Sequence, residues 1–322
     1  MGTLILRRTL YSIPVLLLAS FLLFWMVRTT FDPTARLRVS RDPAVIQAER
    51  ERLGLDDSIV KQYGIWLNDF VHGDWGESSR TREPVTEVIQ RSLWNTVQLI
   101  FWGILVSALI AVSIGVYSAL KQYSAGDYIF TGLSYIGISL PPFWFGLVAI
   151  HFLVVMPQQW FNLSDPPLSF VGLHSVGQSG LNWDYIKHLV LPVMTLSVQI
   201  VASWTRFQRA ATLDVLSSDY IRTARAKGVP RRRVIVRHTL RNSLIPLITV
   251  MAVDIGLLFG GLIITETIFS ISGMGRLFFN SLLQGDVVTL EAWMLVVAVF
   301  ILVFNLLADL LYGVLDPRIR VR

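Results

Sequence analysis

The sequence contains no cysteine, and charged residues are scarce. Asp, Glu, Lys and Arg together make up 16% of its 322 residues. The absence of cysteine excludes disulfide bonds and thiolate metal sites, whichever side of a membrane each loop faces. The low charge accompanies a mean hydropathy of +0.56. This combination is typical of integral membrane proteins.

Motifs for nucleotide, metal or catalytic chemistry are absent as well. No GxxxxGK[ST] phosphate-binding loop occurs, so the chain shows no sign of a nucleotide site of its own. The five histidines are scattered, and none forms HExxH or a close pair with metal-ligand spacing. We therefore expect no catalytic residues, no metal site and no cofactor in this chain.

Long apolar runs dominate what is present. A helix needs about 20 mostly apolar residues to cross about 30 Å of hydrocarbon. Six runs meet this requirement, which predicts an all-α polytopic protein with six transmembrane helices: residues 9–27, 96–120, 129–156, 188–205, 243–269 and 292–315. The first run follows Arg7 and Arg8 but has no small-x-small cleavage site before Arg28. We interpret it as a retained signal-anchor helix.

The distribution of cations predicts the orientation. If the N-terminus is cytoplasmic, six crossings return the C-terminus to the cytoplasm. The cytoplasmic segments then carry 16 Lys and Arg residues, whereas the two short outer loops carry only Lys187 and Arg276. Because cytoplasmic loops collect cations, we expect an N-in, C-in protein. The same rule explains the pI of about 9.8, so we expect no nucleic-acid binding.

Residues 28–95 are expected to form a structured extracytoplasmic segment. Asp42 and Pro43 predict a helix start, with Gly54 as terminator. Ser58 predicts the cap of a second helix that ends at Gly73. One face of this helix is apolar: Ile59, Tyr63, Trp66, Leu67 and Phe70. That face either packs within a small cap, lies in the membrane interface, or docks an extracytoplasmic partner.

Two further signals concern helix geometry. A third helix is expected to begin over residues 86–90, close behind Pro84, and to feed the second crossing. The stretch SLPP at residues 139–142 predicts a break or kink within the third crossing, because proline removes a helix hydrogen bond.

The connector at residues 206–242 is short, strongly basic and sharply delimited. It holds ten of the 28 Lys and Arg residues. Asp219 is a good N-cap for a helix over 220–227, Gly228 suits a left-handed end, and Pro230 begins a second helix leading into the fifth crossing. A topological signal needs charge but not a helix with a defined start and stop. The pattern therefore favours a docking element over a solvated loop.

This connector resembles the cytoplasmic loop of permease subunits of bacterial ABC importers, in their dipeptide, oligopeptide and nickel branch. Of the general signature E-A-A-x3-G-x9-I-x-L-P, only Ala224, Gly228 and Leu240 match. The departures, RTARAKG followed by HTLRN, are those typical of the peptide branch. Other stretches are similar to that branch too: LGLDDSIVKQYGIWL, HGDWGESS, EPV, SLPPFWFG, GGLIITETIFSISGMGRL and LDPRIR. The stretch TTFDPTARL departs from it, where the family usually has Pro-Gly-Asp-Pro.

The resemblance implies the fold of a type I ABC importer permease. Residues 1–27 would form an N-terminal transmembrane helix, 28–95 the extracytoplasmic segment, and 96–322 the transmembrane domain with its cytoplasmic coupling loop at 206–242. It implies a peptide importer in the bacterial cell membrane whose permease does no bond chemistry itself. The implied partners are a second homologous permease, two ATPase subunits that bind ATP and Mg, and an extracytoplasmic peptide-binding protein.

The resemblance also implies that a short coupling helix inserts into a cleft of the ATPase subunit. Its residues here are Asp219, Tyr220, Arg222, Thr223, Ala224, Arg225, Lys227 and Gly228. Independently, Asp254 and Glu266 lie in the fifth predicted crossing. A charge at that depth is costly, so each should face a cavity or a bonding partner. We interpret Asp254 as a pore residue that meets the substrate's positive charge, and Glu266, also a pore candidate, as more structural.

Several alternatives stay open from the sequence. The same architecture could transport nickel or glutathione. A proton-coupled secondary transporter would use an intramembrane acid as a proton relay, although no inverted repeat is evident. An intramembrane aspartyl protease would pair Asp254 with Asp309, but the GxGD pattern of such enzymes is missing.

Overall fold

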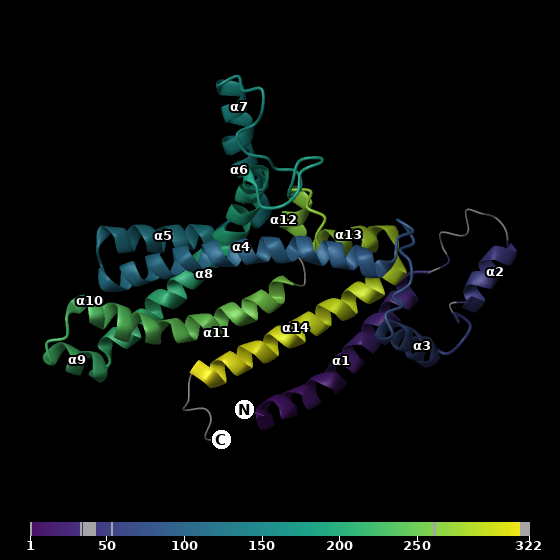
Figure 1. The fold of residues 1–322 in the computed structure, drawn as a ribbon, viewed down its shortest axis with the longest axis horizontal. Helices are drawn as coiled ribbons and strands as arrows, with labels where there is room; N and C mark the ends of the chain where they lie inside the picture. Colours follow the sequence, from purple (N-terminus) through teal and green to yellow (C-terminus); the bar gives the residue numbers. More distant parts are fainter. Residues whose placement is uncertain (1, 33, 35–42, 53, 260–261, 316–322) are drawn as a thin grey trace. The chain divides into compact units, whose positions relative to one another are not determined.

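The computed structural model describes residues 2–32, 34, 43–52, 54–259 and 262–315. Within that part every regular element is helical and no strand is found (Figure 1). The first elements are α1 (Gly2–Thr30), α2 (Pro43–Arg52), α3 (Ile59–Val71), α4 (Val85–Leu120), α5 (Ala125–Ser139), α6 (Pro142–Ile150), the π-helical η2 (His151–Val155) and α7 (Met156–Trp160). They are followed by α8 (Trp183–Ser217), α9 (Asp219–Ala226), α10 (Arg231–Arg233), the π-helical η3 (Val234–Leu240), α11 (Arg241–Leu258), α12 (Ile263–Ile268), α13 (Met274–Gln284) and α14 (Val287–Leu315).

The chain divides into two compact units. The first comprises Met1–Thr96, Phe259–Ile263 and Ser272–Leu306, and the second comprises Val97–Leu258, Ile264–Ile271 and Leu307–Arg322.

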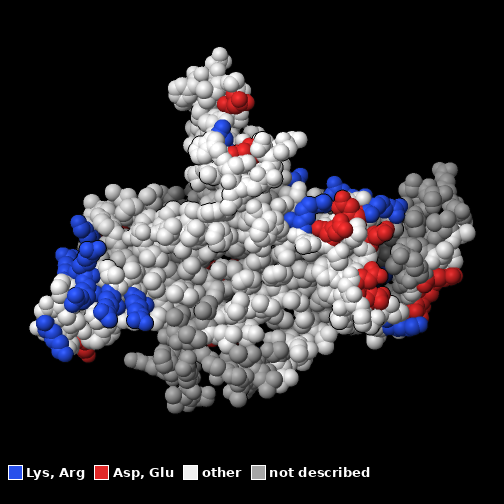
Figure 2. Space-filling view, viewed as in Figure 1, with Lys and Arg blue, Asp and Glu red and all other residues white. Residues whose placement is uncertain are grey.

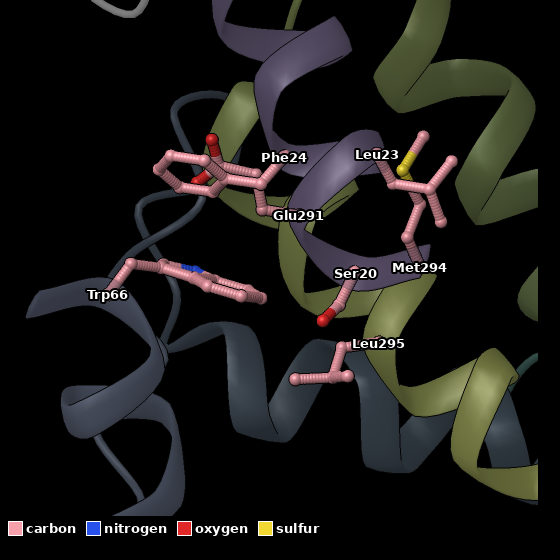
Figure 3. Close-up of a pocket in the computed structure, with 7 residues that line it drawn as sticks. All are labelled: Ser20, Leu23, Phe24, Trp66, Glu291, Met294 and Leu295. Carbon is pink, nitrogen blue, oxygen red and sulfur yellow. The ribbon is translucent and has the colours of Figure 1, made fainter. Parts of the chain in front are cut away.

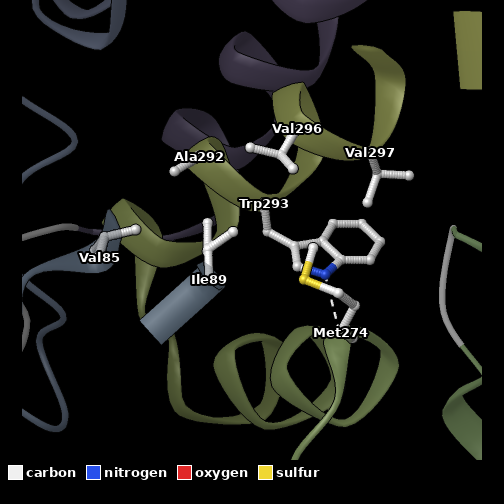
Figure 4. Packing of buried hydrophobic residues seen from close by; sticks show 7 residues of the cluster. All are labelled: Val85, Ile89, Met274, Ala292, Trp293, Val296 and Val297. Atoms are coloured by element: carbon white, nitrogen blue, oxygen red, sulfur yellow. Dashed lines mark hydrogen bonds between the residues drawn. The ribbon is translucent and has the colours of Figure 1, made fainter. Parts of the chain in front are cut away.

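The core of the first unit forms where α4, α13 and α14 meet (Figure 4). Its buried members are Val85, Ile89, Met274, Ala292, Trp293, Val296 and Val297. Burying an indole N–H without an acceptor is costly, and here Trp293 Nε1 donates to the Met274 carbonyl oxygen at 2.8 Å. The hydrogen bond lets a large aromatic side chain fill the core without a polar penalty.

The aromatic face predicted for residues 59–70 is confirmed in α3. Ile59, Tyr63, Trp66, Leu67 and Phe70 are half-buried. The face packs on α1: the ring of Tyr63 lies 5.3 Å from that of Phe21, and the ring of Trp66 lies 5.3 Å from that of Phe24. The hydroxyl groups of Tyr63 and Ser20 are 2.7 Å apart. This contact supports the packing interpretation of the face over a docking surface.

The ends of α2 and α3 agree with most of the sequence prediction. α2 begins at Pro43, whereas its predicted cap Asp42 lies outside the described residues. Ser58 occupies the cap position of α3, but its side chain makes no capping hydrogen bond. After α3 the chain turns at Gly73, whose φ is +90°. The predicted third helix is α4, which begins directly after Pro84 and runs unbroken to Leu120.

In the second unit, α8 packs against α5, α6 and α11. Trp204 of α8 is fully buried with Ala111 of α4 and Leu247 of α11. α4 and α8 approach closely at Gly115, where a Cβ atom would lie 2.9 Å from the Thr205 carbonyl oxygen. Small residues allow such close helix contacts in membrane proteins.

The break predicted within the third crossing is confirmed. α5 ends at Ser139, Leu140 and Pro141 have extended backbone angles, and α6 begins at Pro142. The side-chain amide of Gln199 on α8 donates to the Leu140 carbonyl oxygen at 3.1 Å. A backbone acceptor released by the break is therefore bonded by the neighbouring helix, as a segment at membrane depth requires.

Among the described residues, six helices are long and apolar enough to cross a membrane: Leu10–Thr30, Val85–Leu120, Pro142–Trp160, Trp183–Ser217, Arg231–Leu258 and Val287–Leu310. The number agrees with the sequence prediction. The fifth predicted crossing, 243–269, was too long: α11 ends at Leu258 and α12 is a separate short helix. Phe259 and Leu262, the described residues between these two helices, are not helical. Hydropathy averaged over the stretch does not register that interruption.

Candidate functional site

The basic connector contains a short helix with a defined start and stop. α9 covers Asp219–Ala226, and Ser218, rather than the predicted Asp219, holds the N-cap position with extended backbone angles. Asp219 instead lies in the first helical turn, where a negative charge favours the helix dipole. Ser218 and Asp219 are both good cap formers, so the sequence pattern alone does not separate them.

The C-terminal end of α9 is closed by a complete Schellman motif. Gly228 has a φ of +73°. The Val229 N–H donates to the Ala224 carbonyl oxygen at 3.2 Å, and the Gly228 N–H donates to the Arg225 carbonyl oxygen at 3.0 Å. These are the two bonds that define the motif, and they require a left-handed residue at the glycine position. The left-handed glycine predicted from the sequence is confirmed.

One residue of α9 anchors the helix on its neighbours. Ile221 is completely buried, and α9 packs against α8 and η3. The side-chain amide of Asn242 also lies 3.2 Å from the Tyr220 hydroxyl oxygen, which accepts its hydrogen bond. An apolar anchor and a side-chain bond therefore hold α9 in one orientation.

The rest of α9 and the residues that follow it are mostly exposed and carry a net positive charge. Arg222, Thr223, Arg225, Lys227 and Gly228 are exposed, whereas Ala224 is half-buried. Figure 2 shows Lys and Arg gathering over α9 and α10. The connector thus presents an exposed cationic surface on a helix that is anchored to α8 and η3.

The helices on either side of α9 are joined by buried polar contacts. The side-chain amide of Gln208 on α8 donates to the hydroxyl groups of Thr212 at 3.0 Å and Ser243 at 2.9 Å. All three residues are fully buried. Because α9 lies between α8 and α11 along the chain, this contact ties together both ends of the connector.

A bidentate ion pair fixes the start of α5 against α8. Arg209 Nε and Nη2 donate to the two carboxylate oxygens of Asp127, at 2.8 and 2.9 Å. Asp127 is buried and lies outside the six membrane-length helices. The Arg209 guanidinium holds the pKa of Asp127 below its ordinary value, because it favours the charged carboxylate.

The two acidic pore candidates have different environments. Trp204 Nε1 donates to Asp254 Oδ2 at 2.7 Å, and Asp254 remains half-buried. Glu266 lies on α12 and is completely buried. The burial of Glu266 favours a structural role. Neither geometry shows substrate contact, so the pore role of both residues stays a prediction.

A second ion pair, not predicted from the sequence, lies in the first unit. Arg28 Nε and Nη2 donate to the two carboxylate oxygens of Glu291, at 2.5 and 3.1 Å. Figure 3 shows Glu291 beside Phe24, at the edge of a cavity of about 10 Å³ that could hold one water molecule. The signal was present: Arg28 directly follows the first predicted crossing, and Glu291 directly precedes the sixth.

Comparisons with known proteins agree in both halves of the chain. Residues 111–321 match the family described as binding-protein-dependent transport system inner membrane component. Residues 1–100 match the model for the N-terminal part of such membrane components.

Three relatives illustrate the similarity. The oligopeptide transport system permease protein AppB of Bacillus subtilis (strain 168) is 40% identical, over 99% of each chain. The dipeptide transport system permease protein DppB of Escherichia coli (strain K12) is 37% identical, over 83% of each chain. The oligopeptide transport system permease protein OppB of Mycobacterium bovis (strain ATCC BAA-935 / AF2122/97) is 35% identical, over 98% of each chain.

A solved structure titled as an amino acid ABC transporter with histidines has a TM-score of 0.45 and 14% identity, over 72% of this chain and 94% of that one. The family match covers most of the sequence, and the curated relatives align with nearly all of it. The chain therefore belongs to the family of binding-protein-dependent transport system inner membrane components, and it is a multi-pass cell-membrane protein.

Proposed function

We propose that the chain is the permease subunit of a bacterial ABC importer for peptides, and that α9 is its coupling helix. The relatives named above are permeases of oligopeptide and dipeptide transport systems. The observation that carries the mechanism is the construction of α9: a helix closed by a Schellman motif, anchored by Ile221, with its cationic side exposed.

The physical reason is mechanical. A partner that pushes on a flexible loop loses the displacement in the loop, whereas a rigid helix passes it on. Ile221 and the bond between Asn242 and Tyr220 give α9 that rigidity. The contact of Gln208 with Ser243 then ties α8 to α11, so both membrane helices would move with α9.

The exposed cations define the chemistry of the partner. Arg222, Arg225 and Lys227 would pair with acidic groups of an ATPase subunit. Each of the two permeases would bind one ATPase subunit in this way. ATP and Mg would be bound by the two ATPase subunits. With both termini cytoplasmic, α9 would face those subunits, and residues 28–95 would face an extracytoplasmic peptide-binding protein.

The translocation path would lie between this chain and a second, homologous permease. Asp254 would line it and meet the amino group of the peptide, while Glu266 is the weaker candidate for the path. A peptide pore must accept many side chains. We therefore expect the binding protein to provide most of the recognition, and the permease to make few specific contacts.

The decisive test uses the absence of cysteine from the chain. A single Arg225→Cys variant would be assembled with its ATPase subunits in proteoliposomes and treated with a thiol-to-amine cross-linker. We expect cross-links to the ATPase subunit whose yield changes during ATP turnover. Lys61→Cys, on the exposed face of α3, is the matched control and should give none.

Uptake in the same vesicles tests the transport itself. We expect peptide uptake that requires ATP, the ATPase subunits and the binding protein. Uptake without the ATPase subunits would contradict the proposal and indicate a secondary transporter. Uptake of nickel or glutathione in place of peptide would contradict the substrate and leave the coupling mechanism intact.

A further inference from the structure

An apolar cavity of about 340 Å³ lies in the second unit, between α4, α5 and α8. Its wall includes Ile110 of α4, Leu133 of α5 and Val201 of α8. Two serines also contribute to the wall, but each hydroxyl is turned to a backbone carbonyl: Ser134 donates to Phe130 at 2.8 Å and Ser197 to Gly103 at 3.4 Å. The cavity therefore offers an occupant a largely apolar surface.

An arginine stands beside this cavity. Thr205 lines the wall and Arg206 is the next residue. The Arg206 guanidinium lies 4.8 Å from the ring centroid of Tyr135, which lies on α5 next to the wall residue Ser134. Arg206 is exposed, and no carboxylate within the described part of the chain forms an ion pair with it. Arg209, one turn further along α8, is neutralised by Asp127.

The depth of Arg206 is set by the sequence. The apolar run of the fourth crossing ends at Thr205, so Arg206 lies where α8 leaves the hydrocarbon. The cavity extends from that level along the apolar part of α8, at Met194, Val198 and Val201. A cation at the polar boundary next to an apolar cavity matches one phosphate group with an attached acyl chain.

We propose that this cavity is a binding site for an anionic phospholipid, with an acyl chain between α4, α5 and α8 and the headgroup phosphate on Arg206. A transported peptide is the less suitable occupant. Its backbone amides would need hydrogen-bond partners, and of the hydroxyl groups in the wall only that of Thr205 is not already bonded. An acyl chain has no such requirement, because it carries no hydrogen-bonding groups.

The experiment measures lipid binding to the purified full-length chain in detergent micelles, with spin-labelled phosphatidylglycerol and phosphatidylcholine as probes. We expect the chain to prefer phosphatidylglycerol. Arg206→Gln should raise the Kd for phosphatidylglycerol about tenfold, the effect of losing one charge-assisted phosphate contact. The Kd for phosphatidylcholine should rise less, because its choline group already compensates the phosphate charge. Val201→Phe, which fills the cavity, should weaken both lipids. Arg232→Gln, an exposed cation of α10, is the control and should change neither.

Two results would overturn the proposal. One is unchanged phosphatidylglycerol binding in both Arg206→Gln and Val201→Phe. The other is a photoreactive residue at position 201 that cross-links peptide during transport and never lipid, because this would assign the cavity to the substrate. The binding measurement needs no ATPase subunit, so its failure is distinguishable from failure of the coupling mechanism.

Discussion

Arg28, in the last turn of α1, and Glu291, near the start of α14, form a buried bidentate ion pair within the first unit. Their side chains are 9% and 1% exposed. The Arg28 guanidinium also lies 4.9 Å from the ring centroid of Phe24 on its own helix. The ion pair thus joins two helices that are far apart in sequence. Each of its charged groups is buried and needs the other as a partner.

Breaking this pair should be costly. Glu291→Gln leaves a buried guanidinium without its counter-charge, and we expect the free energy of unfolding to fall by about 3–5 kcal/mol. The measurement is unfolding in mixed micelles followed by tryptophan fluorescence. The double variant Arg28→Met with Glu291→Leu should be close to the wild type, because a packed apolar pair removes both charges.

The matched control is the pair of Arg91 and Glu83, whose side chains are 60% and 42% exposed. Arg91→Gln should cost less than about 1 kcal/mol, as is usual for surface pairs. Equal losses at the two sites would show that the burial of Arg28 and Glu291 has no energetic consequence.

The pair of Asp127 and Arg209 predicts a pH dependence. Arg209 lowers the pKa of Asp127 in the folded chain, so the pair stabilises the fold fully above the unfolded pKa of about 3.9. This contribution is lost as the pH falls further, through the lowered folded pKa. Asp127→Asn should therefore be less stable than the wild type near neutral pH, with a difference that shrinks below about pH 4.

Unfolding midpoints of the two proteins at a series of pH values check this. Asp165→Asn, which removes an exposed acid from the loop after α7, serves as the control and should leave the pH profile unchanged. A difference between wild type and Asp127→Asn that stays constant down to the lowest pH would contradict the assigned ion pair.

Gly228 tests the coupling helix through the backbone alone. A Cβ atom added there would meet no atom within 4 Å, so a substitution acts only through the left-handed backbone conformation. That conformation costs residues with side chains roughly 1–2 kcal/mol. We expect Gly228→Leu to abolish peptide-stimulated ATP hydrolysis or to block complex assembly, while the chain still inserts into the membrane. Gly228→Asn should retain part of the activity, because asparagine tolerates this conformation.

The control for Gly228 is Gly64 of α3, which also has no neighbour within 4 Å of an added Cβ but has no positive φ. Gly64→Leu should couple normally. Normal ATP-driven uptake in Gly228→Leu would remove α9 from the mechanism.

Two substitutions of Asp254 distinguish the role of its charge in the proposed path from the role of its hydrogen bond with Trp204. Asp254→Asn keeps an oxygen that can accept the Trp204 N–H, so stability should be unchanged while peptide uptake falls. Asp254→Leu leaves that buried donor unsatisfied and should cost about 1–3 kcal/mol of stability as well. Normal uptake in a correctly folded Asp254→Asn would restrict Asp254 to a structural role.

Local signals explain why much of the connector could be predicted from the sequence. Gly228 permits the left-handed turn and Pro230 cannot continue the helix, so the end of α9 followed from neighbouring residues. The N-cap was misplaced by one position because two adjacent residues are suited to it.

For the two ion pairs, the positions of the charged residues could be read from the sequence, but the pairing between them could not. In each pair, one residue lies just before a predicted crossing and the other just after one. Arg209 follows the fourth crossing by a turn, and Asp127 precedes the third. Which ends meet depends on how the helices pack. The hydrogen bond between Trp204 and Asp254 depends further on the rotation of two helices about their axes. An apolar run in the sequence does not predict that rotation.

Leu140 and Gln199 show what an interrupted crossing requires. A hydropathy profile treats glutamine in the middle of α8 as an imperfection in an apolar run. In this fold the glutamine side chain donates a hydrogen bond to the neighbouring helix, because the peptide carbonyl at the break needs a donor from outside its own helix. The break in the third crossing therefore depends on a polar side chain in the fourth. In chimeras of homologous permeases, these two crossings should be exchanged together and not singly.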